Sequence, residues 1–331
     1  MTKNNENRIE YVDIYRGIGI VLMIMGHIWF GSYFDKFIHA FHMPMFFFIS
    51  SFFYRKNDLA TMLNKRTKTL LIPYIVWGVF NILILSAIDG VFYKTALLHL
   101  LWINTDGLMN VGAMWFLTAM FFSNIIYSII DHLIKNRTSL NAVVIILSLI
   151  GNLFAGFSPI RLPWALDAAL VAIGFMHIGR LVVEHKNQTI IKKIMQLKWH
   201  EFLATCLFTL VLIFVNGYIN LRTGEYSCIP LFWINALLAI IVLINFSKYY
   251  CNASANSVVI NYSKNIMSYI GKNSITFLCL NQITIKFFTL IFDFMPILVY
   301  KVLVLLMTIT TLCLVNYFIN LTRFRILLGK Q

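Results

Sequence analysis

The chain has 331 residues, of which 60% are hydrophobic and only 12% are charged, and its mean hydropathy is +0.78. Soluble domains carry about 25% charged residues, so the composition excludes an ordinary soluble protein and indicates one that crosses a membrane several times. The formal net charge of +14 would suit a nucleic-acid-binding protein, but the basic residues fall between the hydrophobic segments. That distribution is typical of membrane-protein loops, so we expect membrane lipid and no nucleic acid as a partner.

Ten hydrophobic segments are long enough to cross a bilayer core of about 30 Å, which takes about 20 helical residues. We therefore expect an all-α fold, a polytopic membrane bundle of about ten transmembrane helices that forms a single domain over residues 1–331. The segments lie near residues 12–31, 37–54, 70–88, 112–133, 140–158, 163–183, 201–219, 229–247, 273–292 and 296–320.

The lysines and arginines between these segments predict the orientation of the bundle. With the N-terminus inside, the segments that would face the cytoplasm carry twenty basic residues, and the outer ones carry only Lys36, Lys94, Arg161 and Arg222. Because cytoplasmic loops of membrane proteins are rich in Lys and Arg, we expect both termini to be cytoplasmic.

The first segment contains two ionisable side chains, Arg16 and His27. Such residues cost roughly 2.5–3.5 kcal/mol or more near the centre of a bilayer, so they usually face a protein interior and serve a function. Their spacing along a helix places both side chains on one face, about 16.5 Å apart along the axis. On the expected topology, Arg16 lies near the cytoplasmic side and His27 near the outer side.

Two further histidines, His39 and His42, lie one helical turn apart in the second segment. That segment runs inward, so both lie near its outer end, in one layer with His27. A histidine has an ordinary pKa near 6.5 and can take a proton from a hydroxyl group at neutral pH. We therefore expect His27, His39 and His42 to be catalytic.

Arg16 suits an anion such as a phosphate, which a guanidinium can bind through two hydrogen bonds. A ligand on the scale of the pantetheine arm of coenzyme A, lying along the helix, could contact both Arg16 and His27, and we expect the two to line one continuous cavity. The alternatives are that Arg16 reaches the lipid headgroups or pairs with Asp13, and that the histidines lie at headgroup level. A metal at His39 and His42 would need a third ligand, and no nearby carboxylate is obvious, so we expect no metal.

Five stretches of the chain match known motifs in order. They are the arginine and histidine separated by ten residues (Arg16 and His27), FHMPMFFFISSFFYRK (41–56), KRTKTLLIPYIVW (65–77), MWFLTAMF (114–121) and YIGKNSITFLCLNQ (269–282). Together they resemble the motifs of the acyltransferase-3 family of bacterial membrane acyltransferases. The first two are fairly specific, and the match extends over essentially the whole chain. Two departures are Ser51, where the family usually has glycine, and Asn281, where it has a late histidine.

The resemblance implies an integral-membrane O-acyltransferase in the inner (plasma) membrane of a bacterium. It implies transfer of an acyl group, commonly acetyl from acetyl-CoA, to a hydroxyl group of an envelope or capsular polysaccharide sugar. Arg16 would bind the donor, and Arg66 and Lys68 would meet its phosphates, although these two could also be ordinary topology charges. Asp167 is a candidate for orienting a histidine, or it lies at a solvated helix end.

The alternative function is a transporter or flippase of an envelope sugar or small metabolite. Arg16, the histidines, Lys286 and Lys301 would then form a substrate or proton path. The spacing of Arg16 and His27, together with FHMPMFF, favours the enzyme, because neither feature is expected of a transporter.

Overall fold

The computed structural model of the chain describes residues 9–108, 111–253 and 257–329. Within these ranges, nine spans are helical, long and apolar enough to cross a membrane. They are built by α1 (Glu10–Ile28), α4 with α5 (Leu59–Arg66 and Ile72–Asp89), α7 (Trp115–Leu133), α8 (Arg137–Phe157), α9 (Leu166–Glu184), α11 (Trp199–Asn216), α12 (Ile229–Asn252), α14 (Ser274–Phe292) and α15 (Ile297–Leu321). The predicted all-helical membrane fold is confirmed.

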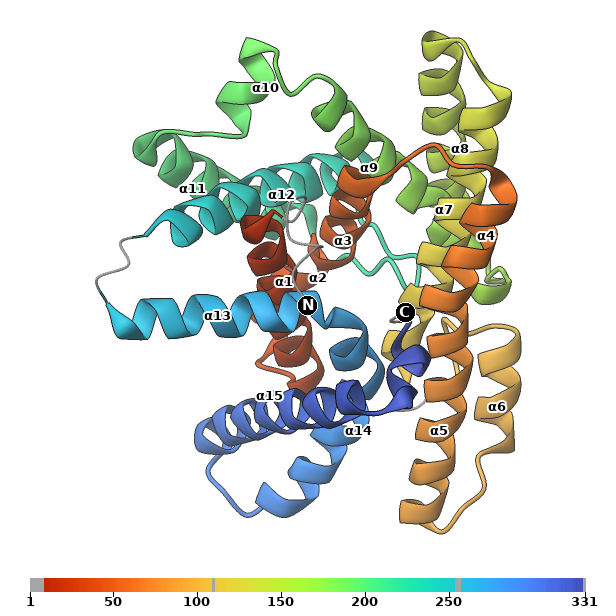
Figure 1. Ribbon diagram of the computed structural model, residues 1–331, viewed down its shortest axis with the longest axis vertical. Coiled ribbons are helices and arrows are strands. Elements are labelled where there is room, and N and C mark those ends of the chain that lie inside the picture. Colours follow the sequence, from red (N-terminus) through yellow and green to blue (C-terminus); the bar gives the residue numbers. More distant parts are fainter. Residues whose placement is uncertain (1–8, 109–110, 254–256, 330–331) are drawn as a thin grey trace.

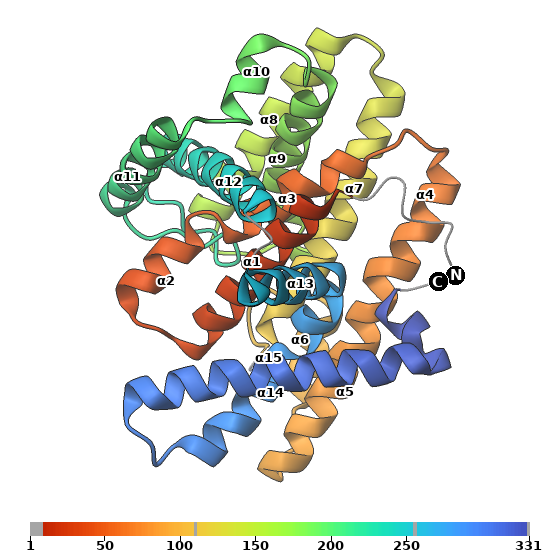
Figure 2. The ribbon, with the colours of Figure 1, turned by 60° about the vertical axis from the view of Figure 1, so that its left-hand side comes forward.

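The second predicted span, 37–54, is not one helix. It is divided into α2 (Ser32–His39) and α3 (His42–Ser50), followed by a 3-10 turn at Ser51–Phe53. The cause is Pro44, because in a continuous helix its ring would clash with the carbonyl of Ala40, four residues earlier. Figure 2 shows α2 and α3 as separate short helices that meet at this break.

Helix α1 lies in the middle of the described fold and contacts α3, α12, α14 and α15. It also packs along α13 (Val258–Lys272), a helix that the hydropathy pattern did not predict because it has only 15 residues and mixes polar with apolar side chains. The two backbones touch at Gly17 and Gly271, where a Cβ would overlap the carbonyl oxygens of Met267 and Asp13. Glycine at both positions therefore sets how closely α13 approaches α1.

Figure 1 shows α4, α5, α6 (Lys94–Leu101), α7 and α8 together on one side of the molecule, and α1, α11, α12 and α13 on the other. A π-helical turn at Thr67–Leu71 joins α4 to α5, so the two form one long rod along one edge of the molecule. The short helices α6 and α10 (Thr189–Ile194) lie in connections between long ones. Short 3-10 turns occupy Gly112–Met114, Pro163–Ala165 and Arg323–Leu328.

Candidate active site

A cavity of about 300 Å³ lies at the C-terminal end of α1. Its polar wall comes from α1, α2, α3, α14 and the loop 217–228 between α11 and α12. The side chains that matter below are His27, Asp35, His39, His42, Arg222 and Gln282. The structure therefore brings the three predicted histidines to one cavity, and we refer to it as the histidine cavity.

The break between α2 and α3 sets the geometry of His39 and His42. Their rings lie edge to face with centroids 5.0 Å apart. Nδ1 of His42 donates to the carbonyl of Ile38 (2.9 Å), which also accepts from the backbone N–H of Phe41 (3.2 Å) at the end of α2. Nδ1 of His39 donates to the backbone carbonyl of Asp35 (2.9 Å) and lies 3.1 Å from Oδ1 of the same residue.

A carboxylate, that of Asp35, lies beside His39, whereas no carboxylate near the two histidines was obvious from the sequence. Asp35 is only 8% exposed, so its charge depends on protein partners. One is His39, and the other is the hydroxyl of Tyr218. Burial and the Asp35 carboxylate raise the pKa of Tyr218 to about 12, so this tyrosine stays protonated and serves as a hydrogen-bond donor. Within the described ranges, no three His, Cys, Asp or Glu side chains form a group that could hold a metal ion.

His27 faces the same cavity from the last turn of α1 and is exposed there. Its Nδ1 accepts a hydrogen bond from Nε2 of Gln282, at 3.4 Å. The amide of Gln282 is oriented by the backbone N–H of Ala113, which donates to Oε1 at 3.1 Å. The preceding residue, Asn281, is fully buried and its Nδ2 donates to carbonyls of its own helix. The residue of α14 that lines the histidine cavity is therefore Gln282.

Arg222 supplies a positive charge to the histidine cavity from the loop 217–228. Its Nε–H donates to the carbonyl of Thr105 (2.8 Å), and its guanidinium lies against Gly112, where a Cβ would overlap it. Burial lowers the pKa of Arg222, but an arginine starts so high that it remains charged. From the sequence, Arg222 is only one of four basic residues in the outer segments, and nothing there indicates that it lines a site.

A second cavity, of about 420 Å³, is lined by Arg66, one of the three residues predicted to bind the donor. Arg55, Lys65 and Arg66 line it together with Phe53, and we call it the basic cavity. The guanidinium of Arg16 lies 5.2 Å from the centroid of the Phe53 ring, in a cation–π contact. Lys68 is exposed and is not among the residues that line this cavity.

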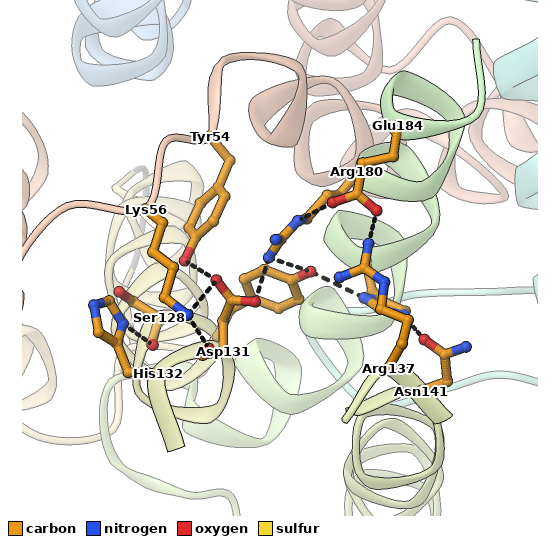
Figure 3. A network of polar contacts seen from close by, with 11 residues as sticks. Tyr54, Lys56, Ser128, Asp131, His132, Arg137, Asn141, Arg180 and Glu184 are labelled. Atoms are coloured by element: carbon orange, nitrogen blue, oxygen red, sulfur yellow. Dashed lines mark hydrogen bonds and ion pairs between the residues drawn. The ribbon is translucent and has the colours of Figure 1, made fainter. Parts of the chain in front are cut away.

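A polar network holds one wall of the basic cavity in place (Figure 3). The hydroxyl of Tyr54 donates to Asp131 Oδ2 (3.1 Å), and Nζ of Lys56 donates to the backbone carbonyl of Asp131 (2.7 Å). Arg180 closes the network with an ion pair to Asp131 Oδ1 at 2.6 Å. Because Tyr54 lines the cavity, this network fixes the segment after the 3-10 turn Ser51–Phe53 against α7 and α9.

The two cavities share no lining residue, and Arg16 lines neither of them, so these two cavities are not the expected continuous cavity lined by both Arg16 and His27. Between Arg16 and His27, the side chains of Met45 and Phe46 lie against α1 at Gly19. A Cβ on Gly19 would be 2.7 Å from Met45 Cε and 2.8 Å from Phe46 Cζ. At Gly19, therefore, α1 is contacted by the ends of two side chains and not by backbone.

Asp167, a candidate from the sequence, and the buried His177 have partners outside these cavities. Asp167 pairs with Arg161 at 2.9 Å and does not orient a histidine. His177 is bonded at both ring nitrogens, by Tyr127 Oη (2.9 Å) and Asn141 Oδ1 (2.8 Å). Asp35 could have been found from its position four residues before His39, which brings the two side chains together on a helix. Arg222 and Gln282 gave no comparable signal.

Comparison with known protein families matches residues 9–316 to a model described as an acyltransferase domain. No curated protein and no solved structure matched the chain. The match covers nearly all of the described helices, both cavities included.

Proposed function

The chain belongs to the acyltransferase-3 family, which makes it a multi-pass membrane acyltransferase, and we propose that its donor is acetyl-CoA and its acceptor a hydroxyl group of an envelope or capsular polysaccharide sugar. One observation supports the proposal above all. Three histidines, the Asp35 carboxylate and the Arg222 guanidinium line one cavity. That cavity lies at the opposite end of α1 from Arg16. The proposal places the chain in the inner membrane of a bacterium, with both termini cytoplasmic.

The donor lies lengthwise along α1 in this proposal. Its phosphates bind at the basic cavity, where Arg66 lines the wall and Arg16 stacks on Phe53, and Lys68 adds charge at the entrance. The pantetheine arm then passes Gly19 and carries the thioester to His27, a span of about 16.5 Å along the helix axis. Met45 and Phe46 must turn aside to admit it, which the flexible thioether of a methionine favours.

The acceptor enters the histidine cavity from the other side. Trp29 and Trp115 lie in its wall and offer aromatic faces to a sugar ring. His27, His39 and His42 together supply the proton transfer and the hydrogen bonds that acyl transfer to a hydroxyl requires.

Lys286, which the transporter alternative places on a substrate or proton path, has an ion-pair partner in the structure. Nζ of Lys286 lies 2.6 Å from Oδ2 of Asp89, in an ion pair between α14 and the end of α5. This pair accounts for Lys286 without a transport path, and family membership identifies the chain as an acyltransferase.

The test is acetylation of envelope polysaccharide in cells that produce the full chain, measured as acetate released by mild alkali. We expect His27→Ala to accumulate normally and to lose about 10²-fold or more of this acetate, the usual scale for a lost acid–base group or a lost hydrogen-bond donor to the reacting carbonyl. His200→Ala, which removes an exposed histidine at the start of α11, is the matched control and should have no effect. Unchanged acetylation in His27→Ala, at equal protein level, contradicts the proposal.

A further inference from the structure

The three histidines of the site differ in which ring nitrogen carries the proton. In a neutral imidazole one nitrogen donates and the other accepts, and the partner of one decides the state of the other. Nδ1 of His39 faces only acceptors, namely the backbone carbonyl of Asp35 at 2.9 Å and its carboxylate at 3.1 Å. Its proton is therefore on Nδ1, and the lone pair is on Nε2.

His27 has the opposite arrangement. Gln282 can present only its NH₂ group to His27, because its Oε1 accepts from the backbone N–H of Ala113. Nδ1 of His27 is therefore the acceptor, and Nε2 carries the proton. In the same cavity, Nε2 of His39 can therefore accept a proton, and Nε2–H of His27 can donate a hydrogen bond.

Asp35 is placed to maintain the first of these states. It is buried, it lies four residues before His39 on α2, and Tyr218 donates to its carboxylate. A buried carboxylate on Nδ1–H holds an imidazole in one tautomer and stabilises the imidazolium that forms when Nε2 takes a proton. His42 also has its lone pair on Nε2 but is held by a neutral carbonyl, so it lacks this stabilisation.

We propose that His39, positioned by Asp35, is the general base of the reaction, and that His27 and Arg222 bind the carbonyl oxygen of the acyl group. This inference rests on the proposed function. The acceptor hydroxyl gives its proton to Nε2 of His39 as its oxygen attacks the thioester carbon. The carbonyl oxygen becomes negative and accepts hydrogen bonds from Nε2–H of His27 and the guanidinium of Arg222. The carbon–sulfur bond then breaks, and the imidazolium of His39 returns the proton to the thiolate of coenzyme A.

Glutamine variants of the two histidines separate the roles, because a glutamine side chain can donate a hydrogen bond but cannot take up a proton. We expect His27→Gln to retain at least about tenfold more polysaccharide acetylation than His39→Gln, at equal protein level. If His39→Gln is the more active of the two, His27 is the base and the inference is overturned.

Asp35 is tested as a positioning residue with a pair of variants. Asp35→Asn keeps the shape but offers Nδ1 an amide, and we expect acetylation to fall by about 10²-fold or more. Asp35→Glu keeps a carboxylate at this position and should retain part of the acetylation that Asp35→Asn loses. The affinity of the detergent-purified protein for acetyl-CoA, measured by titration, should stay within about twofold for both variants. Glu225→Gln, an exposed carboxylate of the loop 217–228, is the matched control.

A purely structural role for Asp35 gives a different result. Both Asp35 variants would then lose donor affinity and protein level together, and Asp35→Glu would be no better than Asp35→Asn. That outcome overturns the inference while leaving the proposed function intact. If the wild-type chain adds no acetate, the proposed function itself is wrong, and the inference falls with it.

Discussion

Arg16 is the residue that links α1 to the basic cavity. Its guanidinium stacks on Phe53, and a planar guanidinium binds a phosphate through two parallel hydrogen bonds, which a lysine cannot do. We therefore expect both Arg16→Lys and Arg16→Ala to weaken the binding of acetyl-CoA by about tenfold or more, with the larger loss in Arg16→Ala. Isothermal titration of the purified protein in detergent measures this directly.

The control for Arg16 is Lys135→Ala, which removes one exposed basic charge from the connection between α7 and α8. It should leave donor affinity unchanged. If all three variants bind acetyl-CoA like the wild type, Arg16 contacts lipid headgroups and not the donor.

At the scale of residues, the sequence singled out candidate site residues whose charge or polarity contrasts with the apolar segments around them. Arg16, His27, His39 and His42 are ionisable groups in apolar segments, and the desolvation cost makes them conspicuous. Asp35 was missed because it lies before the predicted segment 37–54, outside the helix that was expected to carry the histidines. Arg222 and Gln282 join the site only through packing between distant segments, which no local pattern records.

At the scale of elements, the contact between α1 and α13 depends on backbone approach. A Cβ at Gly17 or Gly271 would overlap a carbonyl oxygen of the other helix, and neither backbone can move without separating the helices. We expect Gly17→Ala and Gly271→Ala each to destabilise the protein by about 1–3 kcal/mol, the usual cost of overpacking. Thermal unfolding in detergent, followed by circular dichroism, should show a lower midpoint for both.

Two glycines on the same helix serve as comparisons for Gly17. A Cβ at Gly26 would meet only Ile38 carbons, at 3.5 and 3.8 Å, so Gly26→Ala should not lower the midpoint. A Cβ at Gly19 would meet the ends of the Met45 and Phe46 side chains, which can move, so Gly19→Ala should cost less than Gly17→Ala. Equal midpoints for Gly17→Ala and Gly26→Ala would contradict the argument from backbone contact.

Hydropathy predicted the long helices well because a bilayer span needs a fixed length of apolar sequence. It failed at the apolar segment 37–54, where Pro44 interrupts the helix and α2 and α3 form instead. It also missed α13, which has only 15 residues and mixes polar with apolar side chains, although it packs along α1. The break lies between His39 and His42, whose spacing of three residues already makes them neighbours on a helix, and the structure places their rings edge to face.

At the scale of the whole molecule, the two cavities predict from which side each substrate arrives. The basic residues place the donor end of α1 toward the cytoplasm if the loop charges orient the protein as they do in other membrane proteins. Arg16 and the basic cavity would then take acetyl-CoA from the cytoplasm, where it is made, and the histidine cavity would receive the acceptor from outside. The acetyl group would cross most of the bilayer while still attached to coenzyme A.

Sealed, oriented vesicles containing the full chain test this arrangement. With acetyl-CoA supplied only to the cytoplasmic face and a membrane-impermeant polysaccharide acceptor only to the opposite face, we expect acetylation of the acceptor. The reversed arrangement should give none, and Gly19→Leu, which adds bulk where Met45 and Phe46 already meet α1, should abolish transfer in the productive one at equal protein level. Activity only when donor and acceptor share the cytoplasmic face would show that the acyl group does not pass along α1, and would move the acceptor to a cytoplasmic precursor.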